Sequence, residues 1–276
     1  MENIILFFKS TLTIMIPVFF AALGGLFPAL AGTLNIALEG LLLAGAFSSL
    51  AVFYFSGSVA AAVTSAIISA MILSTLHAFA IFKLRANLFI SGLAINLFSA
   101  GLFIVLSDKL FNTKGVVASN TGGGFLKWYV IIALLLLLLA CLVIYKTPFG
   151  YRLRACEKSS ASLVSLGIAP QFYQTAAILV SGFFCGIGGS FLSLNLGAYV
   201  PGMSAGKGWI ALAVIFLGMK KPLGILAAAF IFALAESFSN YAQGLWSLPS
   251  DFILAFPYVC TLIAIVVVSI IPKKTT

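Results

Sequence analysis

Residues 128–145 read WYVIIALLLLLLACLVIY and include no charged side chain. A helix of about 20 apolar residues is long enough to cross the hydrocarbon core of a bilayer. Eight further apolar runs occupy most of the remaining chain, at residues 11–30, 36–55, 59–82, 88–107, 172–194, 208–219, 223–240 and 252–271. The sequence therefore predicts an all-α fold, a polytopic transmembrane bundle of about eight to ten helices, in which the short run at 208–219 is half of a broken hairpin.

The composition excludes a water-soluble protein. Of the 276 residues, 62% are hydrophobic and 8% are charged, and the mean hydropathy is +1.20, whereas soluble domains are about half apolar and about a quarter charged. A disordered chain is excluded by the same figures, because so much apolar surface does not stay hydrated. We expect one transmembrane domain over residues 1–276, with a long basic loop at 146–170.

The formal charge of +9 comes from 15 Lys and Arg against 6 Asp and Glu. Most basic residues lie in short loops between apolar runs, which is the pattern of the positive-inside rule and not of nucleic-acid binding. If the loop at 146–170 is cytoplasmic, ten basic residues lie on that side: Lys83, Arg85, Lys146, Arg152, Arg154, Lys158, Lys220, Lys221, Lys273 and Lys274. The C-terminus is then predicted to be cytoplasmic. The side of the N-terminus stays open, because Pro17 and Pro28 could break the first run into two elements.

Two segments resemble each other and predict an inverted repeat of two halves. Gly24–Leu30 reads GGLFPAL, and Gly188–Leu194 reads GGSFLSL. An Ile-Ala-Leu triplet follows each segment, at 36–38 and at 210–212. The predicted topology makes the two spans run in opposite directions, as an inverted repeat in a transporter requires.

The sequence has no constellation typical of an enzyme or a metal site. It contains one histidine, His77, and no cluster of Cys and His of the kind that binds zinc. No nucleophile has an evident base partner, and no carboxylate pair has the spacing of a glycosidase. The glycine-rich stretch 202–208 (GMSAGKG) lacks the spacing and the Ser or Thr of a phosphate-binding loop. We therefore expect no enzymatic activity and no cofactor bound by this chain.

Three polar side chains inside or beside apolar runs are candidates for a substrate pathway: Glu39, Asn96 and Glu236. A carboxylate in the membrane costs about 3 kcal/mol unless it finds a partner or a water-filled cavity. Glu39 either caps its own helix, with Asn35 as the N-cap residue, or lines the pathway, and the two roles are compatible. Glu236 either lines the pathway or holds two helices together. Asn96 either lines it or forms a hydrogen bond between helices.

The loop at 146–170 is too polar to cross the membrane. Leu163, Leu166 and Ile168 are expected to make the apolar contacts of a short helix that ends near Gly167. A short basic and apolar helix at the membrane surface is either an interfacial helix or a docking element for a soluble partner.

Three segments resemble the permease subunits of bacterial ABC importers that handle branched-chain amino acids, ribose-type sugars and nucleosides. They are Gly32–Phe47 (GTLNIALEGLLLAGAF), Thr147–Ala155 (TPFGYRLRA) with Leu-Gly-Ile at 166–168, and Met203–Ala213 (MSAGKGWIALA) with Pro-Leu-Gly at 222–224. The segments lie in order and span most of the chain. The runs NIALEG and AGKGWIALA look closest to the simple-sugar and nucleoside branch of that family.

The resemblance implies the permease subunit of an ATP-driven importer that takes up nucleosides, related ribosides or simple sugars by alternating access. It implies a multi-pass protein of the bacterial plasma (inner) membrane that works in the lipid bilayer with three protein partners. These are a cytoplasmic ATPase subunit that uses the ATP, a second permease (the same or a sister chain) and an extracytoplasmic substrate-binding protein. The segment 150–168 maps onto the family's coupling helix, which implies a role in ATPase coupling for Gly150, Arg152, Arg154, Glu157, Leu163, Leu166 and Gly167. In the family the pathway lies between the two permeases, which makes Asn35 and Glu39 candidates for its lining.

Two alternatives stay open at the level of the sequence. One is a permease for branched-chain amino acids within the same family. The other is a secondary transporter driven by protons or sodium through Glu39, Glu236 and His77, since inverted repeats and broken helices fit that class equally well. A secondary transporter would work from this chain alone without ATP, whereas an importer permease would not.

Overall fold

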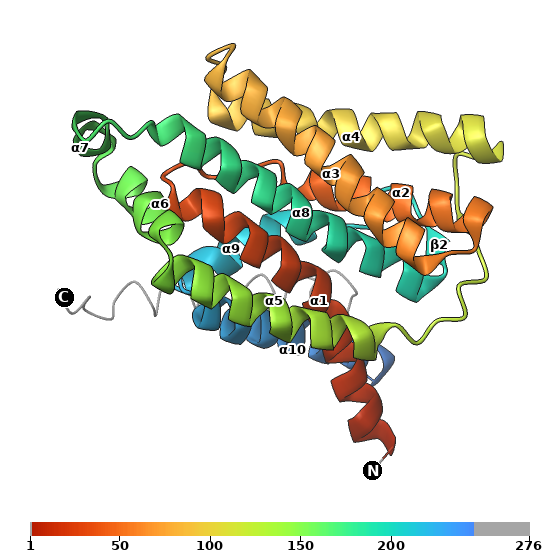
Figure 1. Cartoon of the computed structure of the whole chain (residues 1–276). Helices are drawn as coiled ribbons and strands as arrows, with labels where there is room; N and C mark the ends of the chain where they lie inside the picture. Colours follow the sequence, from red (N-terminus) through yellow and green to blue (C-terminus); the bar gives the residue numbers. More distant parts are fainter. Residues whose placement is uncertain (1, 246–276) are drawn as a thin grey trace.

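The computed structural model describes residues 2–245, with side chains described over residues 4–241. Over that range the chain forms ten α-helices and two short strands (Figure 1). The helices are α1 (Glu2–Leu30), α2 (Leu38–Ser56), α3 (Val59–Phe82), α4 (Leu88–Phe111), α5 (Leu126–Lys146), α6 (Pro148–Lys158), α7 (Ser160–Ser165), α8 (Pro170–Leu196), α9 (Lys207–Leu217) and α10 (Pro222–Leu245). The strands β1 (Val117–Ala118) and β2 (Ala198–Tyr199) pair antiparallel. The predicted run at 252–271 lies outside the described residues.

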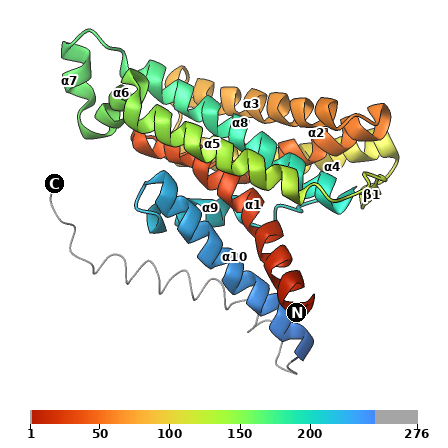
Figure 2. The same cartoon turned by 60° about the horizontal axis from the view of Figure 1, so that its bottom comes forward.

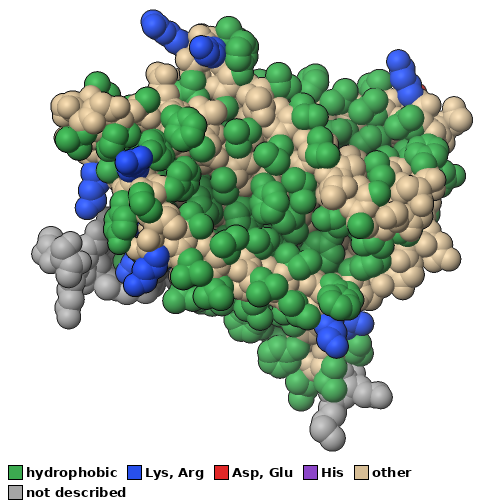
Figure 3. Space-filling model, viewed as in Figure 1, with side chains coloured by type: hydrophobic (Ala, Val, Ile, Leu, Met, Phe, Trp, Pro, Cys, Tyr) green, Lys and Arg blue, Asp and Glu red, His purple; other side chains and the backbone are tan. Residues whose placement is uncertain are grey.

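Seven helices in the described part are long and apolar enough to cross a membrane, namely α1, α2, α3, α4, α5, α8 and α10. They confirm the predicted polytopic bundle, and α3 has the same bounds as the predicted run at 59–82. On the face drawn in Figure 3, apolar side chains cover the middle of the molecule and the Lys and Arg side chains lie towards its ends. Leu97 on α4 and Leu135 on α5 are 68% and 61% exposed, as expected for helices that face lipid.

The first helix is continuous through its two prolines. Pro17 and Pro28 both lie inside α1, so the break that would add another element does not occur in residues 2–30. Membrane helices tolerate proline because neighbouring groups satisfy the carbonyl that loses its donor. The start of α1 lies at the end of the bundle opposite to α6 and α7 (Figures 1 and 2).

Helix α9 is a half-helix that begins inside the bundle. It follows β2 and a turn at 200–206, and its 11 residues span about 16 Å. That length is about half of the hydrocarbon core of a bilayer. Helix α2 also begins after non-helical chain, at residues 31–37. The predicted short run at 208–219 is therefore the helical half of a discontinuous element.

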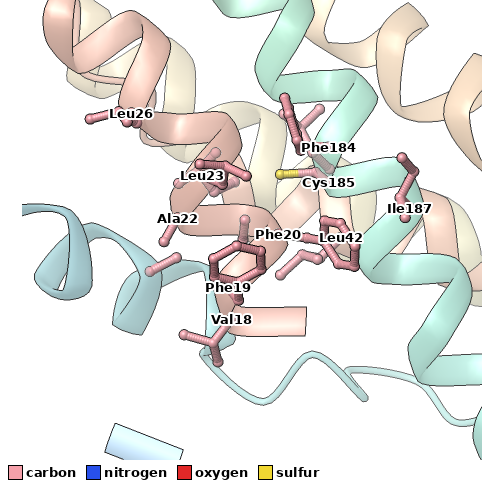
Figure 4. Close-up of a cluster of buried hydrophobic side chains, with 14 of the residues drawn as sticks. Val18, Phe19, Phe20, Ala22, Leu23, Leu26, Leu42, Phe184, Cys185 and Ile187 are labelled. Carbon is pink, nitrogen blue, oxygen red and sulfur yellow. The ribbon is translucent and has the colours of Figure 1, made fainter. Parts of the chain in front are cut away.

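The core lies between α1, α2 and α8. Phe19, Phe20 and Leu23 of α1 gather with Leu42 of α2 and Phe184 of α8 (Figure 4), and each of these side chains is at most 4% exposed. In a bilayer, close packing of this kind is a main source of helix association, since lipid tails are as apolar as the helices.

Glycines of the two repeat segments lie at close helix crossings. A Cβ atom on Gly24 would lie 2.7 Å from the Cβ of Phe184, and one on Gly189 would lie 2.3 Å from the carbonyl oxygen of Leu42. Helices α1 and α8, which carry these glycines, run in opposite directions (Figures 1 and 2). Each is followed by non-helical chain and then by a helix that begins inside the bundle. This is the geometry that the predicted inverted repeat requires.

Candidate functional site

The carboxylate of Glu39 lies where α2 and α9 begin. Its Oε1 atom accepts hydrogen bonds from the hydroxyl of Ser204 and from the backbone N–H of Gly206, the latter at 2.8 Å. Its Oε2 atom accepts the N–H of Gly208 at 2.7 Å. A helix leaves its first N–H groups unpaired and carries a partial positive charge at its N-terminus. Glu39 therefore satisfies the start of α9, and its own charge is compensated within the membrane.

Glu39 caps α9 and not its own helix. The N-cap residue of α2 is Ala37, which makes no side-chain cap bond. The Oδ1 atom of Asn35 accepts the N–H of Ala37 at 3.0 Å, ahead of the helix. The expected local cap of α2 is therefore not formed. The physical reason is the close approach of α9, since a Cβ atom on Gly208 would lie 2.3 Å from the backbone nitrogen of Glu39.

Two buried amides hold the chain at the start of α2. Asn96 on α4 accepts the N–H of Gly40 at 2.8 Å and donates to the carbonyl of Ile36 at 2.9 Å. The amide of Asn35 donates to the hydroxyl of Ser181 on α8. Asn96 thus forms the helix–helix link expected of an intramembrane amide, and the chain ahead of α2 is tied to both α4 and α8.

Glu236 lies outside this hydrogen-bond network, on α10. Its Oε2 atom is buried and has no hydrogen-bond partner among the described residues. The ammonium group of Lys207, at the start of α9, interacts electrostatically with the Glu236 carboxylate. The structure therefore brings Asn35, Glu39 and Asn96 together. Glu236 shares no hydrogen bond with them among the described residues, although Lys207 lies between the two glycines that bind Glu39.

His77 is buried on α3, with its Nδ1 atom 3.0 Å from the hydroxyl of Ser91 on α4. Within residues 4–241, no hydrogen bond connects it to Glu39 or Glu236. The three groups of the proton or sodium hypothesis thus lie on three helices and share no network.

The hydrogen-bond donors to Glu39 were not predicted from the sequence. Ser204, Gly206 and Gly208 belong to the glycine-rich stretch 202–208, which fails the test for a phosphate-binding loop. Its position directly before a short apolar helix was the available signal, because free N–H groups at a helix start attract anions. A carboxylate inside the membrane is the anion that the chain itself supplies.

The loop at 146–170 contains two helices, α6 and α7, instead of the one short helix that the sequence predicts. Thr147 is the N-cap residue of α6, accepting the N–H of Gly150 at 3.2 Å, and Pro148 takes the first helical position. Both are ordinary helix-start signals, so the start of α6 could have been predicted from the sequence. Gly150 is required at the corner between α5 and α6, because a Cβ atom there would lie 2.3 Å from the carbonyl oxygen of Val143.

The residues predicted for ATPase coupling occupy different environments. Leu163 is buried, whereas Leu166 is 73% exposed, so Leu166 packs little against the described part of the chain. The guanidinium of Arg154 lies over the rings of Tyr145 and Tyr151, 5.4 and 5.1 Å from their centroids.

Of the remaining coupling residues, two contact other parts of the chain and one lines a groove. Arg152 donates to the hydroxyl of Tyr173 on α8 at 2.8 Å. Glu157 forms an ion pair with Lys220, in the turn between α9 and α10. Gly167 has a φ of 73° and lines an open groove of ≈ 590 Å³ between α7 and the start of α8.

The fold is a membrane-spanning bundle that contains a half-helix, with polar groups gathered where that half-helix begins and a pair of polar helices at one end. These features are typical of a membrane transport protein. The chain belongs to the family described as "Branched-chain amino acid transport system / permease component", whose sequence profile matches residues 7–268.

Three relatives of the chain are named as permeases of ABC transporters. The guanosine ABC transporter permease protein NupQ of Bacillus subtilis is 30% identical, over 93% of this chain and 89% of its own length. The nucleoside ABC transporter permease protein NupC of Lactococcus lactis is 30% identical, over 90% and 87%. The putative glucose ABC transporter permease protein TsgC13 of Haloferax volcanii is 27% identical, over 82% and 74%. The chain is accordingly a multi-pass transport subunit and not an enzyme.

Proposed function

We propose that this chain is the permease subunit of an ATP-driven importer of nucleosides, with simple sugars as the second substrate class. The names of NupQ and NupC specify guanosine and nucleosides, and that of TsgC13 specifies glucose. The proposed partners are a cytoplasmic ATPase subunit that uses the ATP, a second permease chain and an extracytoplasmic substrate-binding protein.

The observation that carries the substrate proposal is the occupied N-terminus of α9. In transporters with broken helices, a half-helix N-terminus binds the anionic group of the substrate. Here the carboxylate of Glu39 already accepts the N–H groups of Gly206 and Gly208. The carboxylate of an amino acid would meet a fixed negative charge at this place instead of free donors. A neutral, hydroxyl-rich solute suits the site better, which favours a nucleoside or sugar over a branched-chain amino acid.

Glu39 also supports a location for the pathway. Its side chain is partly exposed, although it belongs to the first turn of a membrane helix. A carboxylate that faces lipid is costly. We therefore place the second permease and the substrate path against the surface where α2 and α9 begin. Asn35 and Asn96 would hold this surface from behind, and a pathway role for Glu236 stays a prediction.

The orientation follows from the distribution of charge. The loop at 146–170 is proposed to face the cytoplasm, since most basic residues share its side. The exposed Leu166 and the groove beside Gly167 would then be available to the ATPase subunit. The start of α1 would lie outside, and the C-terminus, beyond the described residues, inside.

The test of the substrate proposal is uptake by the complete assembly in liposomes. Labelled guanosine, ribose and leucine are supplied with the binding protein outside and the ATPase subunits facing the ATP. We expect guanosine uptake that requires hydrolysable ATP, and no leucine uptake. Leucine uptake without guanosine uptake would overturn the proposal, and ribose uptake alone would assign the chain to the sugar class.

A gradient-driven secondary transporter is the second candidate function. The observation in its favour is the buried Oε2 atom of Glu236, which has no hydrogen-bond partner within residues 4–241, because intramembrane carboxylates often belong to proton relays. Against it, Glu39 is held by three donors, and no hydrogen bond in the described part of the chain connects His77 to either carboxylate. We expect no uptake by the purified chain alone under a proton or sodium gradient.

A further inference from the structure

Glu157, near the end of α6, contacts both connections that lead to the Glu39 site. Its carboxylate forms an ion pair with the ammonium of Lys220, in the turn between α9 and α10. Its backbone lies against the connection between α1 and α2, where a Cβ atom on Gly32 would be 3.3 Å from the Cα of Glu157. Helix α6 thus meets the end of α9 and the chain ahead of α2 at one residue.

The turn that carries Lys220 is tightly built. Met219 and Lys220 have φ values of 54° and 52°, a conformation that is unfavourable for residues with a side chain and persists only where the surroundings hold it. The backbones of Gly218 and Gly224 are in contact, since a Cβ atom on Gly224 would lie 2.1 Å from the Gly218 carbonyl oxygen. A displacement of Lys220 is therefore passed to α9 and is not absorbed by the turn.

Helix α9 connects this turn directly to Glu39. Its 11 residues extend for about 16 Å as one helix, and the N–H groups of Gly206 and Gly208 at its start bind the Glu39 carboxylate. On the side of α2, Gln174 of α8 donates to the carbonyl of Ala31 at 3.2 Å, which ties the chain ahead of α2 to α8.

We propose that the ion pair between Glu157 and Lys220 transmits the movement of α6 to α9 and so to the Glu39 site. This inference rests on the proposed function, because it takes the movement of α6 to be imposed by an ATPase subunit. Glu157 is then a positioning residue that faces Lys220 of its own chain and not the ATPase. The two side chains are 37% and 31% exposed, so the pair adds little to folding stability. Its role is to join two elements that must move together.

The test exchanges the two charges within the complete assembly in liposomes. Glu157→Lys, Lys220→Glu and the double exchange are compared for ATP-dependent guanosine uptake and for ATP hydrolysis in the same preparation. Lys221→Glu is the matched control for Lys220→Glu, because it reverses the same charge at the exposed neighbouring position. Asp108→Lys is the matched control for Glu157→Lys, because it reverses a carboxylate charge on α4, outside the proposed route. The neutral variant Glu157→Gln provides the same comparison where a reversed charge prevents assembly.

Each single exchange is expected to lower the ratio of uptake to hydrolysis by about five-fold, the lower end of typical coupling between sites. The double exchange should restore the ratio to within about two-fold of the wild type, since it reforms the pair. The controls should leave it unchanged. Single variants with the wild-type ratio, or a double exchange no better than the singles, would overturn the inference. A wild-type assembly without ATP-dependent uptake would refute the proposed function instead.

Discussion

A Glu39→Gln variant keeps the shape of the side chain and removes its charge. The remaining oxygen can still accept the hydroxyl of Ser204 and the N–H of Gly206, but the new amide nitrogen points its hydrogens at the N–H of Gly208. A buried donor left unpaired costs about 1–3 kcal/mol, and loss of the charge at a helix start costs about 0.3–1 kcal/mol more. The junction of α2 and α9 is thus weakened by about 2 kcal/mol, or about 30-fold in an equilibrium constant.

Uptake of labelled guanosine by the complete assembly is the assay, with copurification of the partner subunits as the measure of assembly. We expect uptake to fall about ten-fold or more while assembly is preserved, because the change is confined to the junction. Ser204→Ala is the matched control: it removes one of the three bonds, keeps the charge and costs about 1 kcal/mol, so uptake should fall about five-fold. Wild-type uptake by a normally expressed Glu39→Gln variant would exclude Glu39 from the transport mechanism.

Four single-residue tests address the contacts around α2 and α6. Gly150→Ala places a methyl group 2.3 Å from the carbonyl oxygen of Val143, so α6 must shift and copurification of the ATPase subunit should be lost. Asn96→Ala removes two buried hydrogen bonds and should lower the thermal unfolding temperature in detergent, at a cost of about 1–3 kcal/mol; an unchanged temperature would contradict the link between α4 and α2. Arg154→Glu should reduce ATPase copurification, whereas full retention would show that this part of α6 does not contribute to docking. Burial raises the pKa of the Cys156 thiol, so maleimide labelling of a variant with only this cysteine should be slow at neutral pH and rise with pH; rapid labelling at pH 7 would contradict the packing of α6.

The membrane spans could be predicted because the bilayer imposes a length and an apolar composition that each run displays locally. The run at 59–82 has the bounds of α3, and the polar loop at 146–170 forms helices too short to span. Thr147 and Pro148 are local signals for the start of α6. The prediction for the loop at 146–170 did not use them, because it rested mainly on the polar composition of the loop.

The junction of α2 and α9 could not be predicted, because it depends on contacts between distant residues. Glu39 and Gly208 are separated by 169 positions, and no local pattern states that a glutamate in one helix caps another. Pro17 does not break α1, since in a bundle the neighbouring groups decide whether a proline interrupts a helix. The exposure of Leu166 could not be predicted either. A leucine in a polar loop can be buried in its own chain or exposed at a surface that binds another protein, and the local sequence does not distinguish the two.

Dependence on ATP and on the partner subunits is the most direct test of the assignment to an ABC importer. Guanosine uptake is compared between liposomes that hold the purified chain alone and liposomes that hold the complete assembly, each with ATP, with a proton gradient and with a sodium gradient. We predict uptake only by the complete assembly with ATP. Uptake by the chain alone under either gradient would contradict the assignment and would make Glu236 the first candidate for the coupling carboxylate.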